Sequence, residues 1–105
     1  MSDPRPSLLI EDLPEDDRPR ERLVQKGVRA LSDAELLAVL LGNGLTGVSA
    51  IDLAQQVLID LGGFSGIHRE DISRLLEIKG VGLAKAARIK AAVEVGYRQI
   101  GRAHV

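Results

Sequence analysis

A short pattern of apolar residues and glycines occurs twice in this chain and limits how the chain can fold. Each copy has two apolar residues three positions apart and then two alternate glycines: Leu37-x-x-Leu40-x-Gly42-x-Gly44 and Leu75-x-x-Ile78-x-Gly80-x-Gly82. If the first copy carries a two-residue insertion, later apolar positions also correspond: Ala50 with Ala86, Leu53 with Ile89 and Val57 with Val93. The pattern predicts two helix-hairpin-helix units related by duplication. The alternative is a chance likeness between two Leu- and Gly-rich helix pairs.

Composition favours an all-α fold. A chain of 105 residues has room for one small domain. Hydrophobic residues make up 45% and are mostly aliphatic, aromatic residues make up 2%, and no stretch alternates like a strand. We therefore expect a small bundle of about five short helices.

Capping and stop signals place these helices. Ser32 and Glu35 form a capping box, Ser49 is a good N-cap, and Gly27 and Gly62 are natural stops. The expected helices are residues 20–26, 33–41, 50–61, 70–78 and 83–99, with residues 64–69 as a connector. The expected domains are an extended arm over residues 1–17, a tandem helix-hairpin-helix domain over residues 18–100 with hairpins at 42–49 and 79–83, and a disordered tail over residues 101–105.

The second hairpin has the residue types that a phosphate-binding turn needs. Gly80 and Gly82 permit backbone conformations closed to side chains and the close approach of a ligand. Backbone amides over residues 81–84 start the last helix, whose positive dipole end favours an anion. Val81 is expected to point inward and to fix the turn. The predicted nucleic-acid-binding residues are Lys79, Gly80, Val81, Gly82, Lys85 and Arg88.

Charge is distributed unevenly, which favours the second hairpin over the first. The net charge is −1, yet residues 79–102 contain six basic residues and only one acidic residue, Glu94. Residues 30–68 contain no Lys or Arg. Contacts to phosphates carry no base information, so binding would be independent of sequence. The expectation is one asymmetric phosphate clamp, and the alternative is a plain interhelical turn with solvated lysines.

Several classes of protein are excluded or disfavoured. Cysteine is absent, so disulfides, thiolate catalysis and cysteine-ligated zinc are excluded. No apolar run approaches the roughly 20 residues that a membrane span needs, and the acidic start is no signal peptide. We therefore expect a monomeric cytoplasmic protein without membrane contact. No catalytic constellation stands out, so neither enzyme activity, a cofactor nor a metal is expected.

Three weaker motifs are set aside. The glycines of residues 42–47 formally fit a dinucleotide fingerprint, but a helix and not a strand is expected before them. His68 and His104 are too isolated to suggest a metal site. The acidic residues 15–17 could bind a hard cation but more often form a solvated helix start. The role of residues 18–23 does not follow from the sequence.

Four pieces of sequence, PEDDRPRERL, ALSDAELLAVLL, GVSAIDLA and IKGVGLAKA, are together quite specific. They make about residues 8–98 resemble the N-terminal region of the bacterial RadC family. The resemblance implies a bacterial cytosolic protein, labelled a DNA repair protein, with a helix-hairpin-helix fold at this end. Full-length members continue into a JAB/MPN metalloprotease-like domain, a JAB-type metal hydrolase. The resemblance implies an isolated N-terminal domain, to which no catalytic residue is carried over.

Two functions remain open from the sequence. The leading hypothesis is a non-catalytic, sequence-independent DNA-binding module of a RadC-like repair protein, with the phosphate at the second hairpin. The rival is a protein-interaction or regulatory module that packs on the JAB-like domain or on a repair partner. The base-free stretch of residues 30–68 and the apolar residues 8–10 favour the rival.

Overall fold

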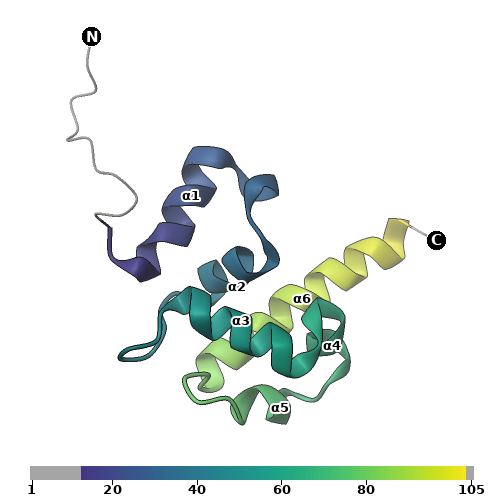
Figure 1. The fold of residues 1–105 in the computed structure, drawn as a ribbon. Helices are drawn as coiled ribbons and strands as arrows, with labels where there is room; N and C mark the ends of the chain where they lie inside the picture. The colour runs from purple at the N-terminus through teal and green to yellow at the C-terminus, as the bar shows by residue number, and fades with distance from the viewer. Residues whose placement is uncertain (1–12, 104–105) are drawn as a thin grey trace.

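The computed structural model describes residues 13–103, which form an all-α fold of six α-helices and two short 3-10 turns without a strand (Figure 1). The elements are η2 Glu15–Asp17, α1 Arg18–Lys26, η3 Val28–Ala30, α2 Asp33–Leu41, α3 Ala50–Leu61, α4 Gly63–Arg69, α5 Ile72–Leu76 and α6 Leu83–Ala103. The expected all-α class is confirmed. An isolated bridge between Leu45 and Val48 closes a tight turn in the loop before α3. Residues 1–12, which include the predicted apolar segment 8–10, lie outside the described part.

Local signals set most helix starts as the sequence predicts. In the capping box of α2, the Glu35 amide donates to Ser32 Oγ at 3.1 Å and the Ser32 amide donates to Glu35 Oε1 at 2.8 Å. At α3, the Asp52 amide donates to Ser49 Oγ at 3.2 Å. Glu35 has a second use, because its Oε2 lies 2.8 Å from Arg22 Nε. This ion pair joins α1 to α2 and gives part of residues 18–23 a structural role.

The predicted connector of residues 64–69 is wrong, because the chain forms helix α4 there. Gly62 ends α3 in the left-handed region, with φ 85° and ψ 45°, and the chain turns directly into a new helix. Gly66 allows a tight turn, since a Cβ there would lie 1.6 Å from the Leu61 carbonyl oxygen. Ile67 is fully buried. Burial of this side chain stabilises a helix that no capping or stop signal in the sequence predicts.

Two other helix lengths differ from expectation. α5 covers only Ile72–Leu76, shorter than the expected 70–78, because Asp71 is its N-cap and the turn toward α6 begins at residue 77. The Ser73 amide donates to Asp71 Oδ2 at 3.0 Å, and this bond lowers the pKa of the Asp71 carboxyl. α6 continues to Ala103, so residues 101–103 are helical and not part of a disordered tail, while 104–105 lie outside the described part.

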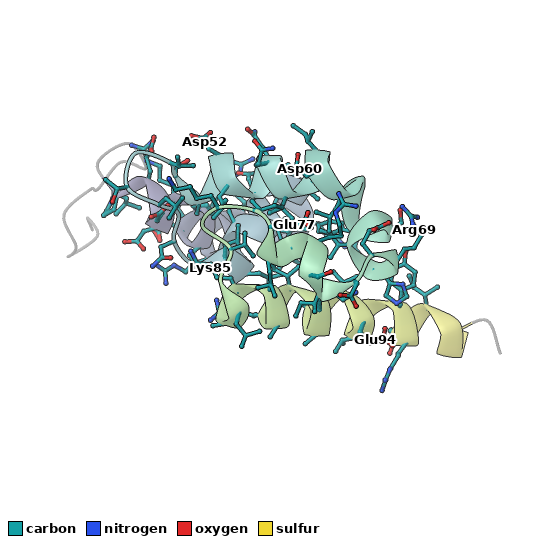
Figure 2. All side chains as sticks on the ribbon, turned by 90° about the horizontal axis from the view of Figure 1, so that it is seen from below. Asp52, Asp60, Arg69, Glu77, Lys85 and Glu94 are labelled. Atoms are coloured by element: carbon teal, nitrogen blue, oxygen red, sulfur yellow. The ribbon has the colours of Figure 1, made fainter. Side chains whose placement is uncertain are left out.

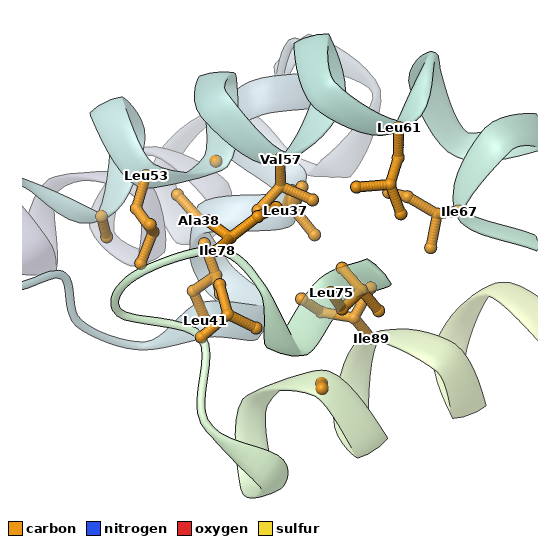
Figure 3. Packing of buried hydrophobic residues seen from close by; sticks show 14 residues of the cluster. Leu37, Ala38, Leu41, Leu53, Val57, Leu61, Ile67, Leu75, Ile78 and Ile89 are labelled. Carbon is orange, nitrogen blue, oxygen red and sulfur yellow. The ribbon is translucent and has the colours of Figure 1, made fainter. Parts of the chain in front are cut away.

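One hydrophobic core joins both copies of the repeated pattern. α2 packs against α3 and α6, while α4 and α5 close the core from the side (Figure 3). Corresponding positions of the two copies are buried together: Leu37 with Leu75, Ala50 with Ala86 and Leu53 with Ile89. Gly42 and Gly80, the first glycine of each copy, both have positive φ, at 81° and 99°. These correspondences support the predicted internal repeat.

Lys90 and His68 tie α4 to α6. Lys90 Nζ donates to the carbonyl oxygens of Ile67, His68 and Glu70 at 3.1, 3.1 and 2.8 Å, which satisfies the end of α4. The His68 ring stacks on Tyr97 with centroids 3.8 Å apart, and its Nε2 lies 2.9 Å from Glu94 Oε1. Hydrogen bonds from Arg98 and then His68 lower the pKa of Glu94. His68 is thus a packing residue.

We predict that Ile67→Ala lowers the free energy of unfolding by about 2–5 kcal/mol, because it leaves a cavity in the core. Ile59→Ala is the matched control: Ile59 is 77% exposed on α3, and its truncation should change stability by less than about 0.5 kcal/mol. Urea unfolding followed by circular dichroism measures both. Equal losses in the two variants would show that α4 does not complete the core.

Candidate nucleic-acid interface

The second hairpin consists of α5, the turn of residues 77–82 and the start of α6. Its turn is closed by hydrogen bonds from the Ile78 amide to the Leu75 carbonyl at 3.1 Å and from the Val81 amide to the Ile78 carbonyl at 3.0 Å. Val81 is 3% exposed, so it points inward and anchors the turn to the core, as predicted. A buried anchor between two glycines holds the backbone of this turn in one conformation.

The two glycines of this turn serve different purposes. Gly80 has φ +99°, and a Cβ there would lie 2.8 Å from Leu45 Cγ, so the first hairpin packs onto it. Gly82 has no positive φ, is exposed, and would have open space around a Cβ. Of the two glycines expected to permit a backbone conformation closed to side chains, Gly80 adopts a positive φ and Gly82 does not. The space over Gly82 is open to solvent.

The start of α6 lies directly beside that open space. The Ala86 amide donates to the Gly82 carbonyl at 2.9 Å, which makes Gly82 the N-cap of a 21-residue helix. The amides of the first turn have no partner within a helix, and they carry the positive end of its dipole. Leu83, the first residue of α6, is 67% exposed. An anion can therefore reach these amides from solvent.

Lys85 and Arg88 have structural contacts that the sequence analysis missed. Lys85 Nζ donates to the carbonyl oxygen of Asn43 at 2.7 Å and to that of Gly80 at 3.4 Å. Arg88 Nη1 donates to the carbonyl oxygen of Leu40 at 2.7 Å. The contact of Arg88 satisfies a carbonyl in the last turn of α2, which has no base of its own, and Lys85 binds the carbonyl of Asn43 just beyond the end of that helix. The absence of a basic residue from the last turn of α2 is a feature of the sequence that could have indicated such contacts, because cations stabilise the C-terminal end of a helix.

The positive charge of this region is not cancelled by ion pairs. Within residues 13–103, no carboxylate lies in ion-pair distance of Lys79, Lys85 or Arg88, and Lys79 is exposed. Lys85 and Arg88 line a groove of about 580 Å³, which is also lined by Arg20 and by two carboxylates, those of Asp16 and Asp17. Asp17 pairs with Arg20, three residues further along at the start of α1. Figure 2 shows Lys85 at the start of α6.

The first hairpin already holds an anion, the carboxylate of Asp16. The Ala50 amide donates to Asp16 Oδ1 at 2.6 Å, and the Gly44 amide donates to Asp16 Oδ2 at 3.2 Å. Ala50 is the first residue of α3, so this carboxylate sits at a helix N-terminus. Asp16 is half-buried and is neither a solvated helix start nor a cation ligand in this arrangement. Sequence reasoning missed it because 28 and 34 residues separate the partners.

The described part of the chain contains no alternative site of the kinds weighed above. Residues 42–47 follow α2 and not a strand, so the dinucleotide interpretation fails. No group of three metal-ligating side chains comes together within residues 13–103. None of the helices in this range combines the length and the hydropathy that a membrane crossing requires.

Comparison with known proteins places the chain among bacterial relatives. The family described as UPF0758 N-terminal matches residues 10–87. A UPF0758 protein of Roseiflexus castenholzii is 53% identical over 91 residues, covering 87% of this chain and 39% of the relative. Those of Chloroflexus aurantiacus and Coprothermobacter proteolyticus are 50% and 46% identical, covering 88% and 93% of this chain and 40% and 42% of theirs. The chain thus spans about two fifths of the length of these relatives. No solved structure matches it significantly.

We predict that Asp16→Asn lowers the free energy of unfolding by about 1–3 kcal/mol, because the Gly44 and Ala50 amides lose a charged acceptor. Their hydrogen exchange, followed by NMR, should become faster. Asp17→Asn is the control, since it breaks only an exposed pair with Arg20, worth less than about 1 kcal/mol. Unchanged protection of both amides in Asp16→Asn would contradict the proposed anchoring.

Proposed function

Since the chain belongs to the UPF0758 family through its N-terminal domain, we propose that it is a non-catalytic module that binds DNA by a backbone phosphate at the second hairpin. The phosphate is held by the first-turn amides of α6, with Lys79, Lys85 and Arg88 supplying positive charge. Such contacts reach the backbone and not the base edges, so binding is independent of base sequence. The resemblance to the RadC family agrees with a role in DNA repair in the bacterial cytoplasm.

The observation that carries this proposal is the identity of the residue before α6. Ser, Asp and Asn stabilise an N-cap better than Gly, and α2, α3 and α5 have Ser32, Ser49 and Asp71 there. The N-cap of α4 is also a glycine, Gly62, but its φ of 85° is one that favours glycine. α6 has Gly82, although neither its backbone angles nor any neighbouring atom requires a glycine. A phosphate oxygen in place of a capping side chain supplies the reason, because a side chain would block its approach.

The carbonyl contacts of Lys85 and Arg88 are compatible with this role. Their acceptors are neutral carbonyl oxygens and not carboxylates, so these contacts introduce no negative charge beside either side chain. An ammonium has three N–H donors and a guanidinium has five, so donors remain for a phosphate. Because both side chains are already held in place, binding costs less side-chain entropy than it would for free lysines.

We predict that Gly82→Asp weakens binding of a fluorescein-labelled duplex of arbitrary sequence about ten-fold or more, equivalent to about 1.4 kcal/mol. The new carboxylate caps the α6 amides and repels the phosphate, so stability should be equal or slightly higher. Fluorescence anisotropy at low salt measures affinity, and thermal unfolding measures stability. Single-stranded and branched DNA should be compared in the same assay.

Gly82→Asn is the matched control, because asparagine also caps the helix but carries no charge. It should lose less affinity than Gly82→Asp. If the wild-type chain binds none of the three DNA forms at low salt, the proposal is wrong. If Gly82→Asp binds as tightly as the wild type, the phosphate is not at this hairpin.

We predict that Lys79→Gln reduces the slope of log affinity against log salt concentration by up to about 0.9, the contribution of one neutralised phosphate. Lys79 is exposed and has no ion pair among the described residues, so its substitution should leave the fold intact. Lys26→Gln, at the end of α1, is the control with an unchanged slope. The same slope in both variants would remove Lys79 from the interface.

A further inference from the structure

A groove of about 450 Å³ lies between α3 and the turn that precedes α6. We name it the acidic groove. Its floor consists of Leu45, Val48, Leu53 and Ile78, and its rim of Asp52, Asp60 and Glu77. Of the residues of the phosphate site proposed above, Lys79 also lines this groove, whereas Gly82, Lys85 and Arg88 do not.

The rim is acidic because one face of α3 is acidic. Asp52, Gln56 and Asp60 are four residues apart, which aligns them along a single helix face. The eight steps along the helix from Asp52 to Asp60 span about 12 Å at a rise of 1.5 Å each. Figure 2 shows both aspartates on the outer side of α3, with Glu77 in the turn below them. The rim thus carries carboxylates on both sides of the groove.

The floor is apolar and incompletely covered. Leu45 and Val48 are each 37% exposed, whereas Leu53 and Ile78 beneath them are buried. The turn of residues 45–48 is held by two backbone hydrogen bonds of 2.8 and 2.9 Å between Leu45 and Val48. The absence of a Cβ at Gly80 lets Leu45 sit at the floor. A partly exposed apolar floor favours a partner that brings apolar side chains of its own.

The cations near the groove do not balance its acids. Asp60 accepts a hydrogen bond from Gln56 at 2.8 Å, and neither Asp52 nor Asp60 has a basic ion-pair partner within residues 13–103. Arg74 compensates part of this charge, because its Nε lies 3.7 Å from Glu77 Oε1 and its Nη2 donates to the Asp60 carbonyl oxygen at 3.2 Å. Lys79 is the one base that lines the groove. Such a surface repels a nucleic-acid backbone and attracts cationic side chains.

We propose that the acidic groove docks a basic amphipathic segment of a partner protein. Apolar side chains of that segment cover Leu45 and Val48, while its flanking Lys or Arg side chains pair with Asp52 and Asp60. An amphipathic helix laid in a groove is a common mode of this recognition. The proposal does not depend on DNA binding at Gly82, so either can fail while the other holds.

The test uses the full chain and a synthetic amphipathic helical peptide with Leu on one face and Lys on the other. A peptide with Glu in place of Lys and one with Ser in place of Leu are the probe controls. Amide chemical-shift mapping should place the largest changes at Leu45, Asp52 and Ile78. Asp52→Asn with Asp60→Asn should weaken binding about five- to ten-fold, the size that two exposed ion pairs supply.

A matched double variant distinguishes this groove from general charge attraction. Glu21→Gln with Asp33→Asn removes the same charge from α1 and α2, outside the groove, and should leave peptide affinity unchanged. Equal weakening in both double variants, or shift changes spread over all acidic surfaces, would overturn the proposal. Self-association of the chain through Leu45 and Val48 in sedimentation experiments would overturn it as well, because a second copy would then cover the groove.

Discussion

Contacts between the two hairpins hold the rest of this structure in place. α2 ends without a base in its last turn, so α6 supplies the missing cations: Arg88 binds the end of α2, and Lys85 binds the following Asn43 carbonyl. Charged donors stabilise helix C-terminal carbonyls more than neutral ones do. Leu45 of the first hairpin packs on Gly80 of the second. The direction of the α6 amides therefore depends on the first hairpin, even if that hairpin binds no ligand of its own.

The two copies share a core but differ in how their helix N-termini are satisfied. In the first copy, Asp16 places a carboxylate on the Gly44 and Ala50 amides, so the site is filled from within the chain. In the second copy, Gly82 leaves the corresponding region open. An internal anion has no translational entropy to lose, so an external phosphate competes poorly with it. The asymmetry inferred from the missing bases of the first hairpin thus has a structural counterpart in Asp16.

The sequence predicts the features that neighbouring residues determine, and it misses those that depend on residues distant in the sequence. Helix α3 and its Ser49 cap follow from residues within one turn, and the sequence predicts them at the observed positions. Helix α4 depends on burial of Ile67 against distant side chains, so local signals indicate only a connector. The contact of Asp16 joins segments that no periodicity relates. The phosphate site stays a prediction. Neighbouring residues in the sequence suggest it, but its ligand is a separate molecule.

Although the net charge is only −1, the chain has two surfaces of opposite charge. α3 has no basic residue and exposes Asp52 and Asp60, whereas the start of α6 exposes amides next to Lys79. The two surfaces adjoin at Lys79, which lines the acidic groove, so the charge of one acts on the ligand of the other even where screening limits charge effects to about 8 Å. A phosphate backbone at Gly82 would be repelled from α3 and would have to leave along the α6 side. The acidic groove would then stay accessible, and a DNA duplex and a basic protein segment could bind the same small domain together.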